Sequence, residues 1–455
     1  MSAEAGTQTT WIDAVRAYGH PRVLGMLFLG FSSGLPFLLV FSTLSAWLRE
    51  SGIERASIGM LSWVGLIYTF KFFWSPVVDR LELPVLHRLL GRRRSWMLVA
   101  QVGIAIGLLN MAHLHPQQGH LAIVAWLALF VAFSSATQDI SVDAWRIEAV
   151  PRSMQGLMAS AYQLGYRIGL LVAGAGALWV AADFGWDTAY RAMAGFACVG
   201  VLTTLLVPEP DVRQRTVALQ QERRVVDWLG RNAHLPAVTR RIVSWFIGAV
   251  VCPFTDFFER YGGRVALLIL AFVGSYRLAD FSMGVMANPF YIDMGFSLKE
   301  IAAIAKGVAV VMSLIGALAG GLAVARLGSV RSLLLGSVMV IAANLLFAAF
   351  AHYGQPNLWG LGLVVGADNL AMGVAGTALV AYLSSLTSAN YTATQYALFS
   401  SAYALPGKLL MGASGFVVDA IDYPAFFCYT ASLGLPALVL LFFLAPHVRD
   451  KQADG

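Results

Sequence analysis

Charged residues are scarce in this chain. Asp, Glu, Lys and Arg make up 12% of its 455 residues, whereas hydrophobic residues make up 58%. An average soluble domain carries about 25% charged residues. The deficit extends along the whole length, which excludes an ordinary soluble protein and predicts a polytopic membrane protein.

Cysteine is also rare, and the common catalytic motifs are missing. Cys198, Cys252 and Cys428 lie far apart, a spacing that indicates neither a disulfide framework nor a zinc site. There is no GxxxxGK[ST] loop and no HExxH motif, and Gly407-Lys408 is followed by Leu409. We therefore expect no catalytic residues, no metal, no cofactor and no enzymatic activity, and nothing points to ATP as the energy source.

The N-terminal segment from Met1 to Arg22 is polar and has no apolar core before the first long run, so no secretory signal is predicted. A membrane span needs roughly 20 apolar residues, and twelve such runs follow. The first six lie near residues 23–48, 57–78, 95–114, 120–143, 154–181 and 188–207. The second six lie near residues 265–292, 297–325, 330–351, 358–386, 392–418 and 424–445.

The Lys and Arg residues between these runs predict the orientation. With the N-terminus inside, 22 of the 31 lie on the inner side and four on the outer side. Short inner loops carry the excess of positive charge in membrane proteins, so both termini are predicted to be cytoplasmic. The net charge of +6 thus reflects topology, and no nucleic-acid partner is expected.

The two halves of the chain repeat one another. Gly52 to Ile58 matches Gly295 to Ile301 at an offset of 243, and Tyr162 and Arg167 match Tyr403 and Lys408 at an offset of 241. Weak internal symmetry at half length is typical of transporters with two bundles around a central path. We predict an all-α membrane protein with twelve transmembrane helices in two pseudo-symmetric six-helix bundles, residues 1–207 and 265–455.

Residues 208–264 form the predicted cytoplasmic linker between the bundles. The linker is basic and contains a semi-apolar segment from Ile242 to Phe258, which we expect to lie on the membrane surface as an interfacial helix. A structural role is the simpler explanation of this segment, and a regulatory role is the alternative.

Two acids stand near the end of the fourth apolar run. Asp139 and Asp143 are four residues apart and share one face of a helix, which Arg146 extends. Acids inside a membrane are costly and usually mark an ion or substrate path. The alternative is a structural ion pair at the inner end of the helix, which suits Asp143 better than Asp139 because Asp143 is closer to Arg146.

Further charges lie inside the predicted spans: the cations Lys71, Arg167, Arg277, Lys306 and Lys408, and the acids Asp280 and Asp368. Their cost in lipid means that they face a polar interior or one another. Mutual neutralisation is one interpretation. The other is a cavity for an anionic or zwitterionic solute, in which a buried carboxyl group holds and releases a proton.

Aromatic and amide side chains accompany the buried cations. Trp74 lies near Lys71, and Tyr162, Gln163 and Tyr166 lie near Arg167. Flat aromatic faces with amide donors suit a sugar ring, although most Trp and Tyr residues in membrane helices serve packing or interface anchoring.

The loop after the second run reads Asp79-Arg80, with Gly91-Arg92-Arg93-Arg94 eleven residues further on. Its counterpart after the eighth run, Gly320 to Arg331, contains Arg326 but lacks the acid. Both resemble the Asp-Arg…Gly-Arg-Arg signature of the major facilitator superfamily. Such a loop holds the inner ends of helices together through ion pairs, so we assign it a gating and structural role.

Several stretches together resemble the muropeptide permease (AmpG) family of that superfamily. They are Gly30–Pro36, Tyr68–Pro76, Gly91–Trp96, Gln138–Arg146, Leu164–Gly169 and Ala393–Leu398. The resemblance implies proton-coupled import of GlcNAc-1,6-anhydro-MurNAc, with or without peptide, across the bacterial inner membrane for cell-wall recycling. Asp368 stands where the family often has Glu, and Lys408 stands where Arg is common, which leaves the preferred fragment open.

We expect a monomeric carrier whose partners are a small-molecule substrate, protons and the lipid bilayer. Its predicted functional residues fall into three groups. The proton-coupling candidates are Asp139, Asp143, Asp280 and Asp368. The substrate-binding candidates are Lys71, Trp74, Gln138, Tyr162, Gln163, Tyr166, Arg167, Arg277, Asn369 and Lys408. The gating candidates are Asp79, Arg80, Arg92, Arg93, Arg146 and Arg326. The alternatives are a carrier or exporter of another bulky anion, such as an acyl-CoA-like solute, and a membrane sensor that binds fragments without moving them.

Overall fold

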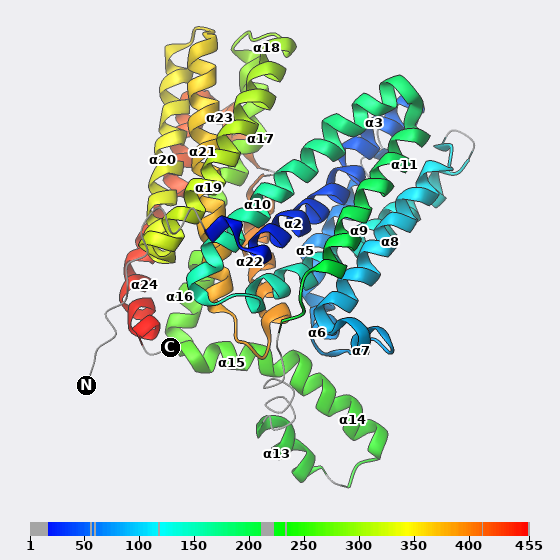
Figure 1. Ribbon diagram of the computed structural model, residues 1–455. Helices are drawn as coiled ribbons and strands as arrows, with labels where there is room; N and C mark the ends of the chain where they lie inside the picture. The colour runs from blue at the N-terminus through cyan, green and yellow to red at the C-terminus, as the bar shows by residue number, and fades with distance from the viewer. Residues whose placement is uncertain are drawn as a thin grey trace.

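The computed structural model describes residues 17–54, 57–58, 61–116, 119–210, 223–232, 234–411 and 413–453. Every regular element within these ranges is a helix. Figure 1 shows two groups of long helices, one from each half of the chain, joined by helices that lie across one end.

The first group contains the elements up to Leu206. They are η1 (Ala17–Gly19), α2 (Pro21–Leu39), α3 (Ser42–Glu50), η2 (Ser62–Gly65), α5 (Leu66–Phe70), η3 (Lys71–Phe73), α6 (Ser75–Arg80), α7 (Leu86–Leu90), α8 (Arg92–Ala112), α9 (Leu121–Glu148), η5 (Arg152–Met154), α10 (Gln155–Leu171), η6 (Val172–Gly176) and α11 (Ala177–Leu206). The linker elements are α13 (Arg223–Arg231), α14 (Ala237–Phe246), η7 (Ile247–Val251) and α15 (Cys252–Tyr261).

The second group begins at Gly263. Its elements are α16 (Gly263–Ser275), α17 (Leu278–Asp293), α18 (Leu298–Ala303), η8 (Ile304–Val308), α19 (Ala309–Leu327), α20 (Ser329–Tyr353), α21 (Leu358–Leu386), α22 (Thr392–Met411), α23 (Ser414–Leu433) and α24 (Leu435–Ala453).

Ten helical segments of the described chain are long and apolar enough to cross a membrane, against twelve expected. One of the ten is Ala237–Tyr261 in the linker, and another, Arg152–Leu206, contains two expected spans that are joined through Gly185, whose φ is 84°. The helix α22 is not among the ten. The second expected span is broken into η2, α5, η3 and α6, and Pro76 at the start of α6 lacks the N–H that would continue the helix from η3.

Each group has its own apolar core. In the first, Leu35 of α2, Ile104 of α8 and Val131 of α9 are buried together. In the second, Phe272 of α16 packs edge-on against Tyr382 of α21 within a separate buried cluster. Two cores divided between the halves of the chain are what a pair of helical bundles requires, and their contact surface is free to be polar.

Glycines bring α2 and α10 into close contact inside the first bundle. A methyl group at Gly165 would collide with the backbone carbonyl of Leu27, and one at Gly34 would collide with that of Tyr166. Small residues allow such backbone approach between membrane helices. The close packing fixes α10, which carries several of the predicted site residues.

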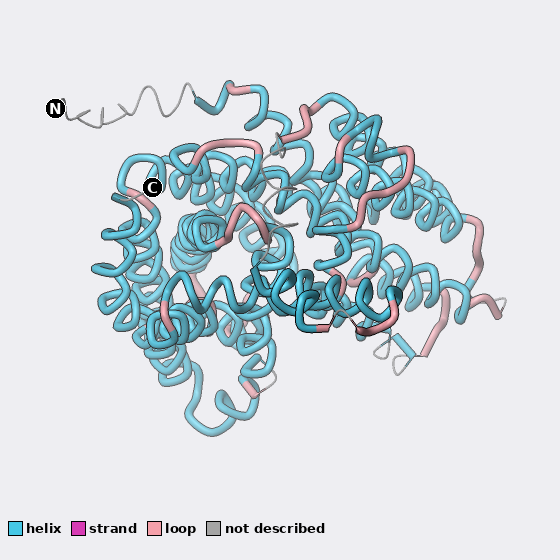
Figure 2. Tube along the Cα trace, turned by 90° about the horizontal axis from the view of Figure 1, so that it is seen from below, coloured by secondary structure: helices cyan, strands magenta, loops and turns pink. Residues whose placement is uncertain are grey.

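The bundles meet at one end and separate at the other. Near α15 the helices of the two groups converge, whereas the ends that carry α3 and α18 diverge (Figure 1). The contacts agree, since α10 packs on α19, and α6 and α9 pack on α22. We call the converging end the linker end and the other the open end. Viewed from the linker end in Figure 2, the linker helices lie in front of the bundles.

Candidate functional site

A polar cavity of about 390 Å³ lies between the bundles. Its walls come from both halves of the chain, with α5, η3, α9 and α10 on one side and α17, α21 and α22 on the other. Seven predicted cavity residues of the first bundle line it: Lys71, Asp139, Asp143, Tyr162, Gln163, Tyr166 and Arg167. From the second bundle, Arg277 and Lys408 line it as well.

An acid between two cations forms the first bundle's side of the cavity. Asp143 Oδ2 lies 3.6 Å from Lys71 Nζ, and Asp143 Oδ1 lies 3.4 Å from an Arg146 guanidinium nitrogen. Asp139, one helical turn away on α9, interacts electrostatically with Lys71 and Asp143. It makes no ion pair within the described part of the chain, and its Oδ1 is buried without a hydrogen-bond partner. Asp143 is therefore neutralised in place, whereas Asp139 is the acid available for another role.

Two arginines from opposite bundles face the same space. The Nε of Arg277, just before α17, lies 2.6 Å from Asp280 Oδ2, so these two residues form an ion pair. Arg167 of α10 interacts electrostatically with Arg277 and Asp368, and its buried Nε has no hydrogen-bond partner among the described residues. Asp280 neutralises Arg277, so Arg167, whose Nε has no partner in the described part of the chain, is the guanidinium group available to bind an anion.

Aromatic side chains and one direct bond between bundles complete the cavity. Lys408 Nζ donates to Thr69 Oγ1 over 2.6 Å, which joins α22 to α5. The rings of Tyr162 and Tyr166 lie 5.9 Å apart on one wall. Ring faces and cations on both walls match a solute with sugar rings and carboxylates.

Five predicted site residues lie outside the lining of this cavity. Trp74 donates to Thr137 and stacks near Phe133, and buried Gln138 is hydrogen-bonded to Ser32 and Ser33 of α2. These contacts favour helix packing over substrate binding. Asn369 donates to Val365 O in its own helix, and Asp280 and Asp368 are buried behind the arginines. These five residues lie outside the cavity because of the way each helix is rotated about its own axis. The sequence alone does not determine that rotation. The side chain of Lys306 lies outside the described residues.

Several residues that line the cavity are not among the predicted site residues. They are Phe37, Tyr68, Thr69, Leu170, Phe281, Val380, Tyr396, Ser400, Tyr403 and Ala404. The internal repeat held a signal for one of them, because Tyr403 occupies the position in the second half that Tyr162 occupies in the first.

A buried ion network closes the linker end of the first bundle. Arg93 of α8 is fully buried and lies 2.7 Å from Asp79 Oδ1 and 2.6 Å from Glu148 Oε1. Glu209 accepts hydrogen bonds from the backbone N–H groups of Arg93 and Arg94 and so caps the start of α8. Burial raises the pKa of Glu209, while these two hydrogen bonds oppose the shift.

The same network reaches the second bundle. Asp79 Oδ2 accepts hydrogen bonds from the backbone N–H of Thr394 at 3.2 Å and from its Oγ1 at 3.1 Å, at the start of α22. Arg146 donates to Ser384 Oγ at 2.7 Å and lies 4.9 Å from the centre of the Tyr396 ring. These contacts fasten the two bundles together on the linker side of the cavity, and we call them the latch.

The remaining gating candidates lie around the latch. Arg80 stacks over the ring of Tyr391 and lies against Gly248 of the linker. Arg92 begins α8, and Arg326 lies in the last turn of α19; both are partly buried.

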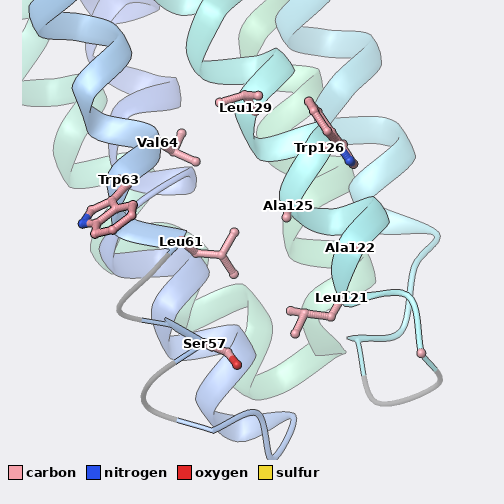
Figure 3. Close-up of a pocket in the computed structure, with 10 residues that line it drawn as sticks. Ser57, Leu61, Trp63, Val64, Leu121, Ala122, Ala125, Trp126 and Leu129 are labelled. Atoms are coloured by element: carbon pink, nitrogen blue, oxygen red, sulfur yellow. The ribbon is translucent and has the colours of Figure 1, made fainter.

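A larger cavity of about 720 Å³ lies on the outer face of the first bundle. Figure 3 shows Trp63 on one side of it and Trp126 on the other, where Ala122 and Ala125 of α9 also lie. Both tryptophans are 71% exposed, and no charged residue lines the space. This groove faces the hydrocarbon of a membrane, so the smaller polar cavity is the candidate site.

Comparison with known proteins places this geometry in a family. The model of the major facilitator superfamily matches residues 24–410. A putative transporter, AmpG 4 of Rickettsia felis, is 33% identical over 430 residues, which is 94% of this chain and 97% of the relative. The anhydromuropeptide permease of Escherichia coli K12 is 34% identical over 431 residues, which is 94% of this chain and 80% of the relative.

Solved structures agree at the level of the fold. The proton:xylose symporter XylE superimposes with a TM-score of 0.65 at 13% identity and covers 95% of this chain and 96% of its own. The human organic anion transporter MFSD10 gives a TM-score of 0.61 at 16% identity, over 92% of this chain and 99% of its own.

Proposed function

Because the chain belongs to the muropeptide permease (AmpG) family of the major facilitator superfamily, we propose that it carries anhydromuropeptides across the bacterial inner membrane. The substrate is GlcNAc-1,6-anhydro-MurNAc with or without its peptide, and the chain acts as a monomer without enzymatic activity. The observation that carries the proposal is the polar cavity, in which cations and tyrosines from both bundles surround a space of about 390 Å³.

The lining suits the chemistry of such a fragment. Arg167, with Arg277 beside it, attracts a lactyl or peptide carboxylate. The tyrosine rings of α10 and α22 provide apolar faces for the sugars. A cavity of this size lies within the range of roughly 300–1,000 Å³ that is usual for small-molecule sites.

The arrangement of the bundles supports alternating access. The latch closes the linker end, and the helices diverge at the open end. We assign the linker end to the cytoplasm, since Lys and Arg concentrate there. The structure then corresponds to a carrier that receives substrate from the periplasm, and breaking the latch while the open end closes delivers it to the cytoplasm.

Proton coupling is assigned to Asp139. Asp143 is held between Lys71 and Arg146, whereas Asp139 faces the cavity without an ion-pair partner in the described structure. A carboxyl group in this position can take up a proton with the substrate and release it after the bundles move. Asp280 and Asp368, behind the arginines, are the next candidates.

The test is uptake of a labelled GlcNAc-anhydro-MurNAc peptide into proteoliposomes, with and without an inward proton gradient. We expect the gradient to drive accumulation, an uncoupler to abolish it, and Asp139→Asn to equilibrate substrate without accumulating it. Asp187→Asn is the matched control, because Asp187 is half-exposed and pairs with Arg191. Gradient-driven accumulation by Asp139→Asn would remove the proton role from Asp139. Binding without uptake by the native protein would instead indicate a sensor.

A further inference from the structure

The linker helix α14 has an apolar face that no part of the described chain covers. None of its ten residues is buried. Val238 is 71% exposed, Ile242 62%, Phe246 52% and Trp245 40%. These four positions recur at helical spacing and fall on one side of the helix. An uncovered stripe of large apolar side chains next to a membrane domain marks a surface that binds something.

Positive charge borders this stripe. Arg241 is exposed beside it, and Arg240 lies on the far side. Between residues 223 and 246 the linker carries five arginines and a single acid, Asp227. Arg224 forms an ion pair with Glu259, which holds α13 near α15. A cationic helix with Trp at the edge of its apolar face has the composition of a helix that lies in a lipid headgroup layer.

The segment after α14 is firmly attached to the transport domain. Gly248 and Ala249 of η7 are buried, and Phe257 of α15 packs edge-on against Phe399 of α22. Gln395 of α22 donates to Pro253 O and to Asp256, each over 2.8 Å. These contacts hold α15 at the linker end of the bundles, so α14 is joined to a fixed part of the structure.

We propose that α14, together with α13, binds the anionic lipid headgroups of the leaflet at the linker end, with its apolar stripe in the acyl boundary. Arg241, at the edge of the stripe, contacts the headgroup phosphates, while Val238, Ile242, Trp245 and Phe246 enter the hydrocarbon edge. Charge complementarity selects this occupant, because a stripe meant for a neutral partner would gain nothing from the surrounding arginines. The inference does not depend on which solute the cavity carries.

The linker is connected to the latch through α15 and the start of α22. The helix α15 continues from α14 through η7 and is bonded to Gln395, next to Thr394, which Asp79 holds. Anionic lipid that draws α14 onto the leaflet therefore stabilises α15 against the start of α22. The lipid composition of the leaflet then changes the stability of the contacts that join the two bundles.

The experiment measures where α14 lies in a bilayer. The full-length protein with Cys198, Cys252 and Cys428 replaced by alanine receives a spin label at Ile242→Cys. It is reconstituted in vesicles of phosphatidylcholine alone and of phosphatidylcholine mixed with phosphatidylglycerol. Collisions with oxygen report lipid contact, and collisions with a water-soluble nickel chelate report solvent contact. We expect the label to move from solvent into lipid when phosphatidylglycerol is present.

Two matched variants complete the design. A label at Ser244→Cys, on the opposite face of α14, should stay in solvent in both vesicles. Replacing Arg241 by alanine should move the Ile242 label toward solvent, because an arginine at the membrane surface contributes about fivefold to partitioning onto an anionic leaflet.

Three results would overturn the proposal. A label at position 242 that stays in solvent in both vesicles would show that the stripe is not on lipid. Burial in lipid to the same degree without phosphatidylglycerol would remove the headgroup recognition. Dipolar broadening between labels would identify a second copy of the chain as the occupant. Failure of substrate uptake is a separate observation, because none of these readouts uses a solute.

Discussion

The hydroxyl of Thr394 offers a direct test of the latch. Thr394 Oγ1 donates to Asp79 Oδ2 over 3.1 Å and is the part of the latch that a small substitution can remove. Valine has the same branched shape without the hydroxyl, so Thr394→Val deletes this bond and leaves the backbone N–H of residue 394 and the Asp79–Arg93 pair in place. The change therefore weakens the contact between the bundles and leaves no cavity at position 394.

The size of the effect follows from the charge on the acceptor. A hydrogen bond to a charged group contributes about 1.5–3 kcal/mol, and every 1.4 kcal/mol is about a factor of ten, so the equilibrium shifts by roughly 10- to 150-fold. The bond exists only while the linker end is closed, so the loss falls on that state alone. A minor state with an open linker end, populated at about 1%, would rise to roughly 10–60%.

The assay is a distance distribution between two spin labels at the open end. Glu54 follows α3 and Gln355 follows α20, and both are exposed. We expect Thr394→Val to add a population with a shorter distance between labels at these positions, since the open end closes when the latch separates. The measurement is made in nanodiscs without substrate, so that binding does not bias the equilibrium.

A matched variant separates this effect from a general loss of stability. Thr430 is also fully buried, and its Oγ1 donates to Asn344 Oδ1 over 2.6 Å, but both residues belong to the second bundle. Thr430→Val should lower the melting temperature and leave the distance distribution unchanged. If Thr394→Val also leaves the distribution unchanged while the protein stays folded, the hydroxyl does not hold the bundles together and the reasoning fails.

Two further predictions concern packing and pH. Gly165→Ala should lower the melting temperature by several degrees, because the added methyl group collides with the Leu27 carbonyl. Gly284→Ala is the control and should not lower it, because the space around Gly284 is open. Equal melting temperatures of the two variants would contradict the close contact of α2 and α10. Because the pKa of Glu209 is raised, the folded protein binds a proton at this carboxyl group more tightly than the unfolded chain does. Protonation of Glu209 therefore adds to the free energy of unfolding below the ordinary pKa of about 4.5, and this contribution is lost as the pH rises through the raised pKa. Unfolding of the native protein and Glu209→Gln, compared across that range, should show a stability difference that changes with pH, and a constant difference would exclude this linkage.

Much of the candidate site was predictable because charge in a membrane is expensive. Lys71, Asp139, Arg167 and Lys408 interrupt apolar runs, and the only places for them are a polar interior or an ion pair. All four line the cavity. The cost of placing a charge in lipid is large enough to decide which way its side chain faces. The location of such residues can therefore be predicted from the sequence.

Aromatic and amide residues were only partly predictable, because Tyr162, Gln163 and Tyr166 line the cavity whereas Trp74 and Gln138 do not. Trp74 and Gln138 have the chemistry of a sugar site, yet their contacts are with Thr137 and with the serines of α2. Tyr68 and Tyr396, by contrast, line the cavity. A tyrosine or glutamine serves packing as readily as binding, and a rotation of the helix by one residue decides which.

The sequence by itself determined that this is a membrane protein of two related halves, because scarcity of charge, apolar length and the repeat are properties of the chain alone. It also determined which loop carries the latch, through Asp79 and the Arg92–Arg94 run. Only the tertiary structure decided the partners across the bundles. Asp79 meets Thr394 across 315 positions, and Arg146 meets Ser384 across 238. Contacts of that kind depend on how two rigid bundles are rotated against each other, and local sequence carries no record of that rotation.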